Sequence, residues 1–314
     1  RNDMKNSKGQ KERAFRKNRR VSSAAKRKGS VSMQQELSRE SYAEKKRAEL
    51  SDLYSILNDE TKKIASDQEA FRTYLDVQAH FDRYSVSNAI LIAAQFPKAL
   101  QLKTFDEWQK TETRIRKGER SIKILEPHEY RTNGGEVKKG YRVKKLFDVS
   151  QTDTEIQKPY IEHMTRELLK SLLKASTVSF EAVEMLEDGK HAVYEHSQRM
   201  IYVKRGLSDD EFFKAVTLEI VHARIASKES EYRRNLYEKK SSAIAYMLQQ
   251  KYGLEEKNTA LQIPEELSEK NGRDIKKELF GMRTLFTEIN EELKLAIKKE
   301  QDIKVSERDG HEER

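Results

Sequence analysis

The stretch 84-YSVSNAILIAAQFP-97 decides how the first part of the chain folds. Its apolar run predicts a helix over residues 85–95, and Pro97 ends that helix because proline lacks an amide hydrogen. Asn88 and Gln95 lie seven residues apart and therefore share one face of the helix. Their amides can either bridge neighbouring elements or bind a ligand.

The segments on either side of this helix predict an α+β unit. Helical periodicity marks residues 41–65 and 71–84, where apolar residues recur at three- and four-residue steps. After Pro97, three stretches alternate as strands do: 102–108, 121–127 and 141–149. Lys117-Gly118 and Asn133-Gly134-Gly135 supply turn signals, and the second is typical of a hairpin connection.

A second unit follows a polar linker at residues 150–160. Its patterns predict a small sheet among helices: helices over 161–176, 207–227, 239–253 and 275–297, and strands over 178–184 and 192–205. The predicted fold class is α+β with two domains, one α+β and one mainly helical with a small sheet. The predicted segments are a disordered basic tail at 1–37, domains at 38–153 and 154–300, and a disordered tail at 301–314.

Positive charge is concentrated in two places. Residues 1–36 hold twelve Lys and Arg against three acids, which accounts for the whole net charge of +9. Residues 97–145 hold fourteen Lys and Arg against seven acids. Two basic zones on an otherwise neutral chain predict a polyanionic partner, and nucleic acid is favoured over a membrane because the tail has no apolar face.

Composition excludes several classes of protein. The chain has no cysteine, so disulfide frameworks and thiolate metal sites are excluded. No apolar run approaches the roughly 18–20 residues needed to cross a bilayer. The first residues are charged and polar, unlike a signal peptide. These features predict a soluble protein of the cytoplasm without a membrane partner.

The stretch 217-TLEIVHARIA-226 is related in pattern to H-E-x-x-H. In that motif two histidines one helical turn apart hold zinc, and the glutamate activates the metal-bound water. Here Glu219 and His222 stand at the right spacing, but Leu218 occupies the place of the first histidine. The alternatives are an altered metal site and an ordinary amphipathic helix.

The first unit, over roughly residues 38–153, resembles the N-terminal domain of ArdC-type antirestriction proteins. The resemblance is carried by Tyr84-Ser85 and Asn88, Ala94-Gln95 and Pro97, Phe105 and Trp108, Lys117-Gly118-Glu119, and 147-FDVSQT-152. One departure is Thr113-Arg114, where the family usually has Gly-Arg. The resemblance implies binding of single-stranded DNA.

Sequence-tolerant binding of a single strand requires cations along the phosphates and flat groups under the bases. Ten residues are predicted to supply these contacts: Arg83, Tyr84, Asn88, Gln95, Trp108, Arg114, Arg116, Lys117, Arg120 and Lys123. Tyr84 and Trp108 are the predicted stacking residues, although a lone tryptophan is also a common core residue.

The second unit resembles the zinc-peptidase-like domain related to the ImmA/IrrE family that follows in ArdC-type proteins. Aligned on Ala245-Tyr246, the family's glutamate ligand falls on Ser242, so two of three ligand positions are Leu218 and Ser242. This predicts a protein without metal, cofactor or peptidase activity, in which Glu219 and His222 are relicts. Glu238, His191 and His196 are the alternative ligands nearest in sequence, none at a convincing spacing.

Three functions are compatible with these patterns. The first is a single-stranded-DNA-binding protein of a mobile genetic element, of the conjugation or antirestriction type, with an inactive metallopeptidase-like domain. The second is a metal-dependent peptidase that keeps zinc through unusual ligands. The third is a DNA-transfer accessory protein that docks a relaxase or primase.

Overall fold

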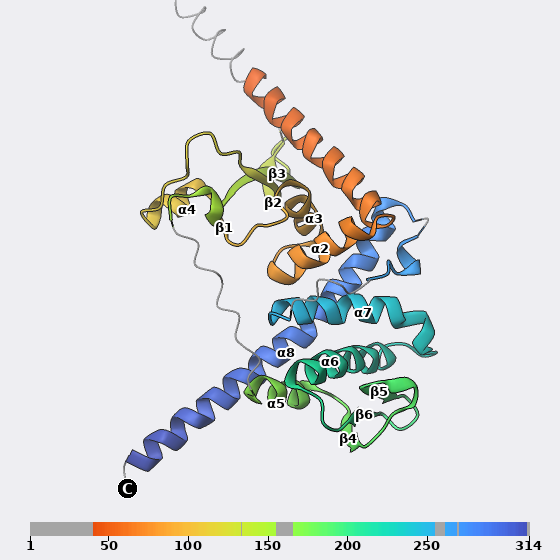
Figure 1. Ribbon diagram of the computed structural model, residues 1–314. Helices are drawn as coiled ribbons and strands as arrows, with labels where there is room; N and C mark the ends of the chain where they lie inside the picture. The colour runs from red at the N-terminus through yellow and green to blue at the C-terminus, as the bar shows by residue number, and fades with distance from the viewer. Residues whose placement is uncertain (1–39, 133, 155–165, 255–260, 269, 313–314) are drawn as a thin grey trace, which may run out of the picture. The chain divides into compact units, whose positions relative to one another are not determined.

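The computed structural model describes residues 40–132, 134–154, 166–254, 261–268 and 270–312. Residues 40–52 belong to one compact unit and are helical, and Lys46 pairs there with Glu49. The other compact unit runs from Leu53 and contains both sheets (Figure 1). The predicted basic tail at 1–37 and most of the predicted linker at 150–160 lie outside the described residues.

The first region of this second unit combines helices with a three-stranded antiparallel sheet. Residues 53–64 are helical. The elements after them are α2 (Gln68–His80), α3 (Val86–Gln95), β1 (Leu102–Lys103), α4 (Phe105–Lys110), β2 (Ile122–Arg131), β3 (Val137–Asp148) and the short helix η1 (Val149–Gln151). The strand order is β1-β3-β2, and Ile122 pairs with Leu146. The predicted α+β mixture is confirmed.

Helix α3 is fixed to β2 by two side-chain amides. Asn88 donates to the carbonyl of Leu125 and accepts from its amide, both at 2.9 Å. Gln95 makes the same pair of bonds with Lys123, at 2.8 and 2.9 Å. Residues two apart on a strand present their backbone groups to the same side, so the two amides satisfy the backbone groups of β2 that face away from β3.

One predicted strand is wrong. Residues 102–108 alternate in polarity, yet only Leu102–Lys103 is extended and Phe105–Lys110 forms α4. The cause is a capping box, in which the Thr104 side chain accepts from the Glu107 amide while the Glu107 carboxylate accepts from the Thr104 amide. These bonds satisfy donors at the helix start and outweigh the alternating pattern.

Among the described residues, the second region contains a small mixed sheet and four α-helices. They are α5 (Arg166–Ala175), β4 (Ser179–Val183), β5 (Ala192–Glu195), β6 (Met200–Lys204), α6 (Asp209–Ala226), α7 (Arg234–Lys251) and α8 (Gly272–Glu312). The strand order is β4-β6-β5; β4 is parallel and β5 antiparallel to β6. Helix α6 lies within the predicted helix at 207–227 and begins at a Ser208–Glu211 capping box.

The core of this region lies between α6, α7 and α8, which pack in sequence order. Phe213 on α6, Ile244 on α7 and Phe286 on α8 are fully buried. Helix α8 continues to Glu312, whereas the sequence predicts disorder from residue 301. Lys304, Glu307 and Arg308 of this segment are good helix formers, so its polar composition is compatible with a helix.

Residues on both sides of the predicted domain boundary contact one another. Helix α2 packs against α7, and the Tyr246 hydroxyl donates to Asp76 at 2.6 Å. The boundary near residue 153 therefore stays a prediction. Within the described ranges, none of the helices has the length and apolar character needed to cross a membrane.

Candidate nucleic-acid interface and altered metal site

A buried carboxylate organises the end of β3. Asp148 is fully buried, and its Oδ1 accepts from the amides of Leu100 and Gln101 at 2.7 and 2.8 Å. Its Oδ2 accepts from the amide and hydroxyl of Ser150 at 2.9 and 2.5 Å. Four donors on one carboxylate satisfy its buried charge without a cation. The motif 147-FDVSQT-152 thus closes the loop that precedes β1 onto the end of the sheet.

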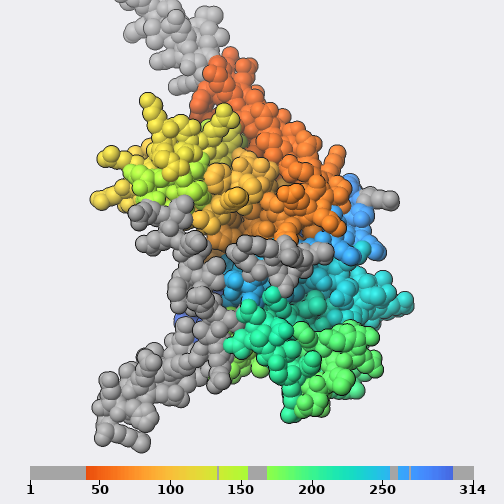
Figure 2. Space-filling model, in the orientation of Figure 1, coloured from red at the N-terminus to blue at the C-terminus, as the bar shows by residue number. Residues whose placement is uncertain are grey.

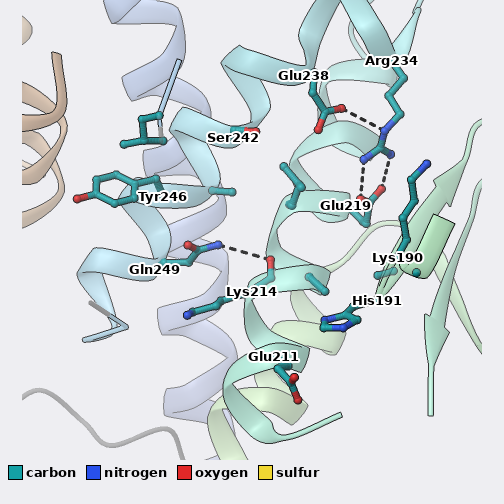
Figure 3. Close-up of a pocket in the computed structure, with 16 residues that line it drawn as sticks. Lys190, His191, Glu211, Lys214, Glu219, Arg234, Glu238, Ser242, Tyr246 and Gln249 are labelled. Atoms are coloured by element: carbon teal, nitrogen blue, oxygen red, sulfur yellow. Dashed lines mark hydrogen bonds and ion pairs between the residues drawn. The ribbon is translucent and has the colours of Figure 1, made fainter. Parts of the chain in front are cut away.

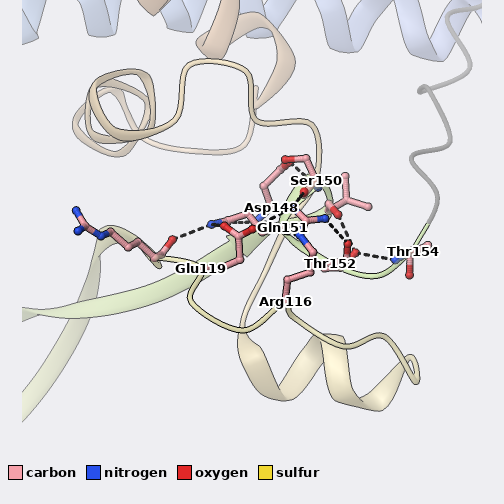
Figure 4. A network of polar contacts seen from close by, with 9 residues as sticks. Arg116, Glu119, Asp148, Ser150, Gln151, Thr152 and Thr154 are labelled. Atoms are coloured by element: carbon pink, nitrogen blue, oxygen red, sulfur yellow. Dashed lines mark hydrogen bonds and ion pairs between the residues drawn. The ribbon is translucent and has the colours of Figure 1, made fainter.

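The same motif holds the loop between α4 and β2. Gln151 donates to Glu119 Oε2 at 3.1 Å and to the Arg120 carbonyl at 2.8 Å. Arg116 donates to the carbonyls of Thr152 and Ser150 at 2.7 and 2.5 Å, and it also pairs with Glu119 (Figure 4). Arg116, predicted to contact DNA, is therefore occupied in anchoring this loop.

Three cations project from the anchored loop. Arg114, Lys117 and Arg120 are exposed, and their side chains have no partner among the described residues. The turn between them depends on Gly118, whose φ of +93° is a conformation that residues with a Cβ rarely adopt. The sequence predicts that these cations bind DNA, and their surroundings leave them open to an anionic partner.

Trp108, which the sequence predicts to stack on DNA bases, is buried in the structure. Its ring is 3% exposed, its Nε1 donates to the Phe147 carbonyl at 2.9 Å, and the Lys103 ammonium lies 4.4 Å from the ring centroid. Burial of the large ring stabilises the contact between α4 and β3, and the indole N–H is satisfied there. Trp108 is a core residue.

Of the other residues predicted to contact DNA, some hold the fold together and others lie at the surface. Asn88 and Gln95 hold α3 against β2, and Lys123 is half-buried beside Gln95. Arg83 is exposed, whereas Tyr84 is half-buried with its ring edge-on to Phe81. Burial, together with the charge of Glu107, raises the pKa of the Tyr84 hydroxyl. The structure brings no continuous row of these ten side chains together.

The sequence predicts the hairpin formed by β2 and β3, but not the exposed side chains that make it a candidate interface. Tyr130 and Tyr141 are 48% and 52% exposed on it. A Cβ at Gly140 would lie 3.2 Å from Cε1 of Tyr130, so the absence of a side chain there lets the Tyr130 ring lie across the strand. The exposed cations of the hairpin are Arg131, Lys138, Lys139, Arg142 and Lys145. Figure 2 shows long side chains of this yellow and lime region projecting from the surface.

The register places the two tyrosines on opposite faces of the hairpin. Tyr130 pairs with Lys138, and Arg142 lies four residues further along the same face. Tyr141 pairs with Pro127 on the other face. Arg142 is held by Glu126 at 2.7 Å, and the pKa of Glu126 is lowered by Lys144 and by Arg142. The signal that sequence reasoning overlooked is aromatic residues interleaved with cations on two paired strands.

The altered metal motif lies on α6, at one side of a cavity of about 570 Å³. Leu218 and Ser242, which occupy the predicted ligand positions, both line this cavity. Glu219 is 2% exposed, and its carboxylate takes two bonds from Arg234 at 2.7 and 2.8 Å (Figure 3). Its Oε2 also accepts from the Tyr194 amide at 2.6 Å.

His222 is fully buried and faces a different set of partners. Its Nδ1 lies 2.8 Å from the Tyr232 hydroxyl and 3.3 Å from Ser241 Oγ. Its Nε2 lies 3.3 Å from Glu238 Oε2, within ion-pair distance but outside hydrogen-bond geometry. The structure thus brings Glu238 to the motif. His191 lines the cavity, whereas the His196 ring lies tilted against that of Tyr232, with centroids 5.2 Å apart.

The electrostatics of the cluster centre on Arg234. Burial alone would lower the pKa of its guanidinium, but the hydrogen bond and charge of Glu219 and the charge of Glu238 raise it above its ordinary value. His222 and Arg234 lower the pKa of Glu238. Burial raises the pKa of the Tyr232 hydroxyl. Arg234 therefore supplies a permanent cation beside both carboxylates, Glu219 and Glu238.

These residues do not fit a metal ion. Catalytic zinc requires three protein ligands and an open position, and here Leu218 and Ser242 offer no imidazole or carboxylate. The carboxylate of Glu219 is already satisfied by Arg234 and Tyr194. Across the part of the chain that the structure describes, there is no group of three or more His, Asp or Glu side chains arranged to hold a metal.

Residues 55–166 match the family model of the N-terminal domain of anti-restriction factor ArdC. Two crystal structures of the antirestriction protein ArdC from the R388 plasmid, one metal-free and one Mn(II)-bound, match 76% of this chain and 97% and 98% of their own. Their TM-scores are 0.51 and 0.52, at 16% and 13% identity. The chain has the ArdC fold. No curated protein sequence matches it.

The ArdC fold extends beyond the matched N-terminal domain. Because 76% of the chain is covered, the similarity takes in much more than residues 55–166. Conservation of fold at this level of identity carries no ligand with it. The relation of the second region to zinc peptidases stays a prediction, and the residues that line its cavity must be judged by their own chemistry.

Replacement of Arg116 by alanine should loosen the loop between α4 and β2. The two guanidinium hydrogen bonds to the Thr152 and Ser150 carbonyls would be lost, and the single ammonium of lysine cannot replace them. Trypsin should therefore cleave R116A and R116K after Lys117 several-fold faster than the wild-type protein. Mass spectrometry identifies the cut. R114A is the matched control, and cleavage of R116A at the wild-type rate would contradict the anchoring role.

Proposed function

We propose that this chain is a single-stranded-DNA-binding protein of a mobile genetic element, of the plasmid antirestriction type. The match to the ArdC N-terminal domain supports the type. The observation that carries DNA binding is the exposed trio Arg114, Lys117 and Arg120 on a loop anchored by Arg116 and Gln151. Preorganised cations bind phosphates at little cost in conformational entropy.

The β2–β3 hairpin supplies the second element of the proposed interface. A single strand is held by stacking of its bases on exposed aromatic rings, in addition to cations along its backbone. Tyr130 lies across Gly140 and shares a face with Lys138 and Arg142. A ring supported from behind by a glycine backbone has its other face free to accept a base. This assigns base stacking to Tyr130, in place of Trp108.

The proposed protein has no peptidase activity. Leu218 and Ser242 stand where the metal motif has ligands, and Glu219, which stands where the motif has its water-activating glutamate, is bonded to Arg234 and Tyr194. Three of the roughly four lone-pair sites of this carboxylate take part in these bonds, which leaves little of it to activate a water molecule in the cavity. The role proposed for the second region is structural.

The loop cations are tested with R114A/K117A/R120A in the full chain. Each phosphate contact contributes about 0.7 to the salt dependence of single-strand binding, so the slope of log K against log salt should fall by about 2. Fluorescence anisotropy with an oligothymidylate gives both affinity and slope. The control K170A/R273A/K277A removes the same charge from exposed positions elsewhere.

Equal losses in the two triple variants would show that net charge alone attracts DNA and would overturn the proposed interface. The same variants separate binding from function in cells. Survival of unmodified plasmid DNA entering a restricting host should rise with the wild-type chain and should fall back with the loop variant only.

The stacking role is tested with Y130A, Y130F and Y141A. Loss of a stacked ring should cost about 1–3 kcal/mol of single-strand binding energy, so Y130A should bind several-fold to a hundredfold more weakly. Y130F keeps the ring and should bind like wild type, and Y141A lies on the opposite face. Binding of Y130A at wild-type strength, or an equal loss in Y141A, would reject the assignment.

The absence of peptidase activity is tested on the purified full chain with casein, in the presence of added Mn(II) or Zn(II). Hydrolysis should stay at the level of buffer alone, because Arg234 occupies the carboxylate that would activate water. Chelator-sensitive hydrolysis that is lost in E219Q would refute this part of the proposal.

A further inference from the structure

Glu219 of the altered motif and Glu238 of α7 converge on one guanidinium. Arg234 donates to both oxygens of Glu219, and its Nε lies 3.2 Å from Glu238 Oε2. Glu238 in turn lies 3.3 Å from His222 Nε2. Two carboxylates and an imidazole are donors typical of a divalent transition-metal site. Here the positively charged Arg234 side chain lies between the two carboxylates.

The local sequence explains why Arg234 reaches this place. It is the first residue of α7, four residues before Glu238, so the two share a helix face and pair along it. Glu219 lies on the adjoining helix α6, which packs against α7. The planar guanidinium can therefore face Glu219 with its two terminal nitrogens and Glu238 with Nε.

Burial separates this cluster from a surface ion pair. The Glu219 side chain is 2% exposed and that of Arg234 is 30% exposed, whereas exposed pairs contribute little to stability. A buried carboxylate without a cation would be strongly unfavourable. Oε2 of Glu219 also accepts a hydrogen bond from the Tyr194 amide on β5. The Glu219 carboxylate on α6 therefore connects β5 with Arg234 of α7.

We propose that the Arg234 guanidinium is the permanent cation of this site and takes the place that a divalent metal would need between Glu219 and Glu238. It compensates the two carboxylates, and it excludes a metal ion from the cluster by charge and by volume. This inference goes beyond the proposed DNA function and does not depend on it. It also accounts for Glu219 and His222 without any catalytic role.

The test compares R234M with R233M by thermal unfolding of the full chain in chelator-treated buffer. Methionine keeps most of the volume of arginine and removes its charge. Arg233 is the matched control, because it is exposed and its side chain makes no capping hydrogen bond to α7. R234M should lower the Tm by several degrees, and R233M should leave it unchanged. The double variant E219Q/R234M should recover most of the loss, because the buried charge is removed with its partner.

Mn(II) is the probe that separates cation replacement from ordinary packing. It should raise the Tm of R234M and bind it in calorimetric titration, while leaving the wild-type chain and E219Q/R234M unaffected. Equal Tm values for R234M and R233M, a Mn(II) shift as large in wild type as in R234M, or no Mn(II) shift in R234M would each overturn the proposal. If R234M does not fold, a folded E219Q/R234M supports the proposal and an unfolded one overturns it.

Discussion

The carboxylates of Asp148 and Glu219 are almost completely removed from water, and the structure around each depends on how its charge is satisfied. Asp148 is met by backbone amides and a serine hydroxyl, so the chain must fold back on itself beside β3. Glu219 is met by a guanidinium and one amide, which requires α7 and β5 to approach α6. Unpaired, either charge would cost more than the packing around it contributes.

The two solutions give the two regions different properties. Backbone amides are fixed in place, so the network at Asp148 makes a rigid support from which the loop between α4 and β2 presents its cations. A guanidinium carries charge and volume of its own, so at Glu219 it fills the position instead of leaving it open. The first arrangement leaves cations exposed at the surface, whereas the second neutralises a cation within the structure.

The sequence predicts the elements better than their contacts. Periodicity identifies α6 and α7, and alternation with turn signals identifies the β2–β3 hairpin. The motif residues of 147–152 prove to be structural. Alternation misleads at residues 102–108, although the Thr104–Glu107 box is visible in the sequence. The shared face of Asn88 and Gln95 is predicted, but their partner strand is not, because only tertiary packing selects it. Arg234 escapes prediction because nothing local connects it to Glu219, fifteen residues earlier.

The amide pair on α3, Asn88 and Gln95, also affects association between separate molecules. The order β1-β3-β2 makes β2 an outer strand, and its segment from Ile122 to Leu125 is rich in β-branched and apolar residues. An outer strand of this kind is a template for pairing between separate molecules, and such pairing leads to aggregation. Asn88 and Gln95 close that edge with side chains, at the positions where another chain would otherwise bond. Their docking therefore protects solubility as well as the fold.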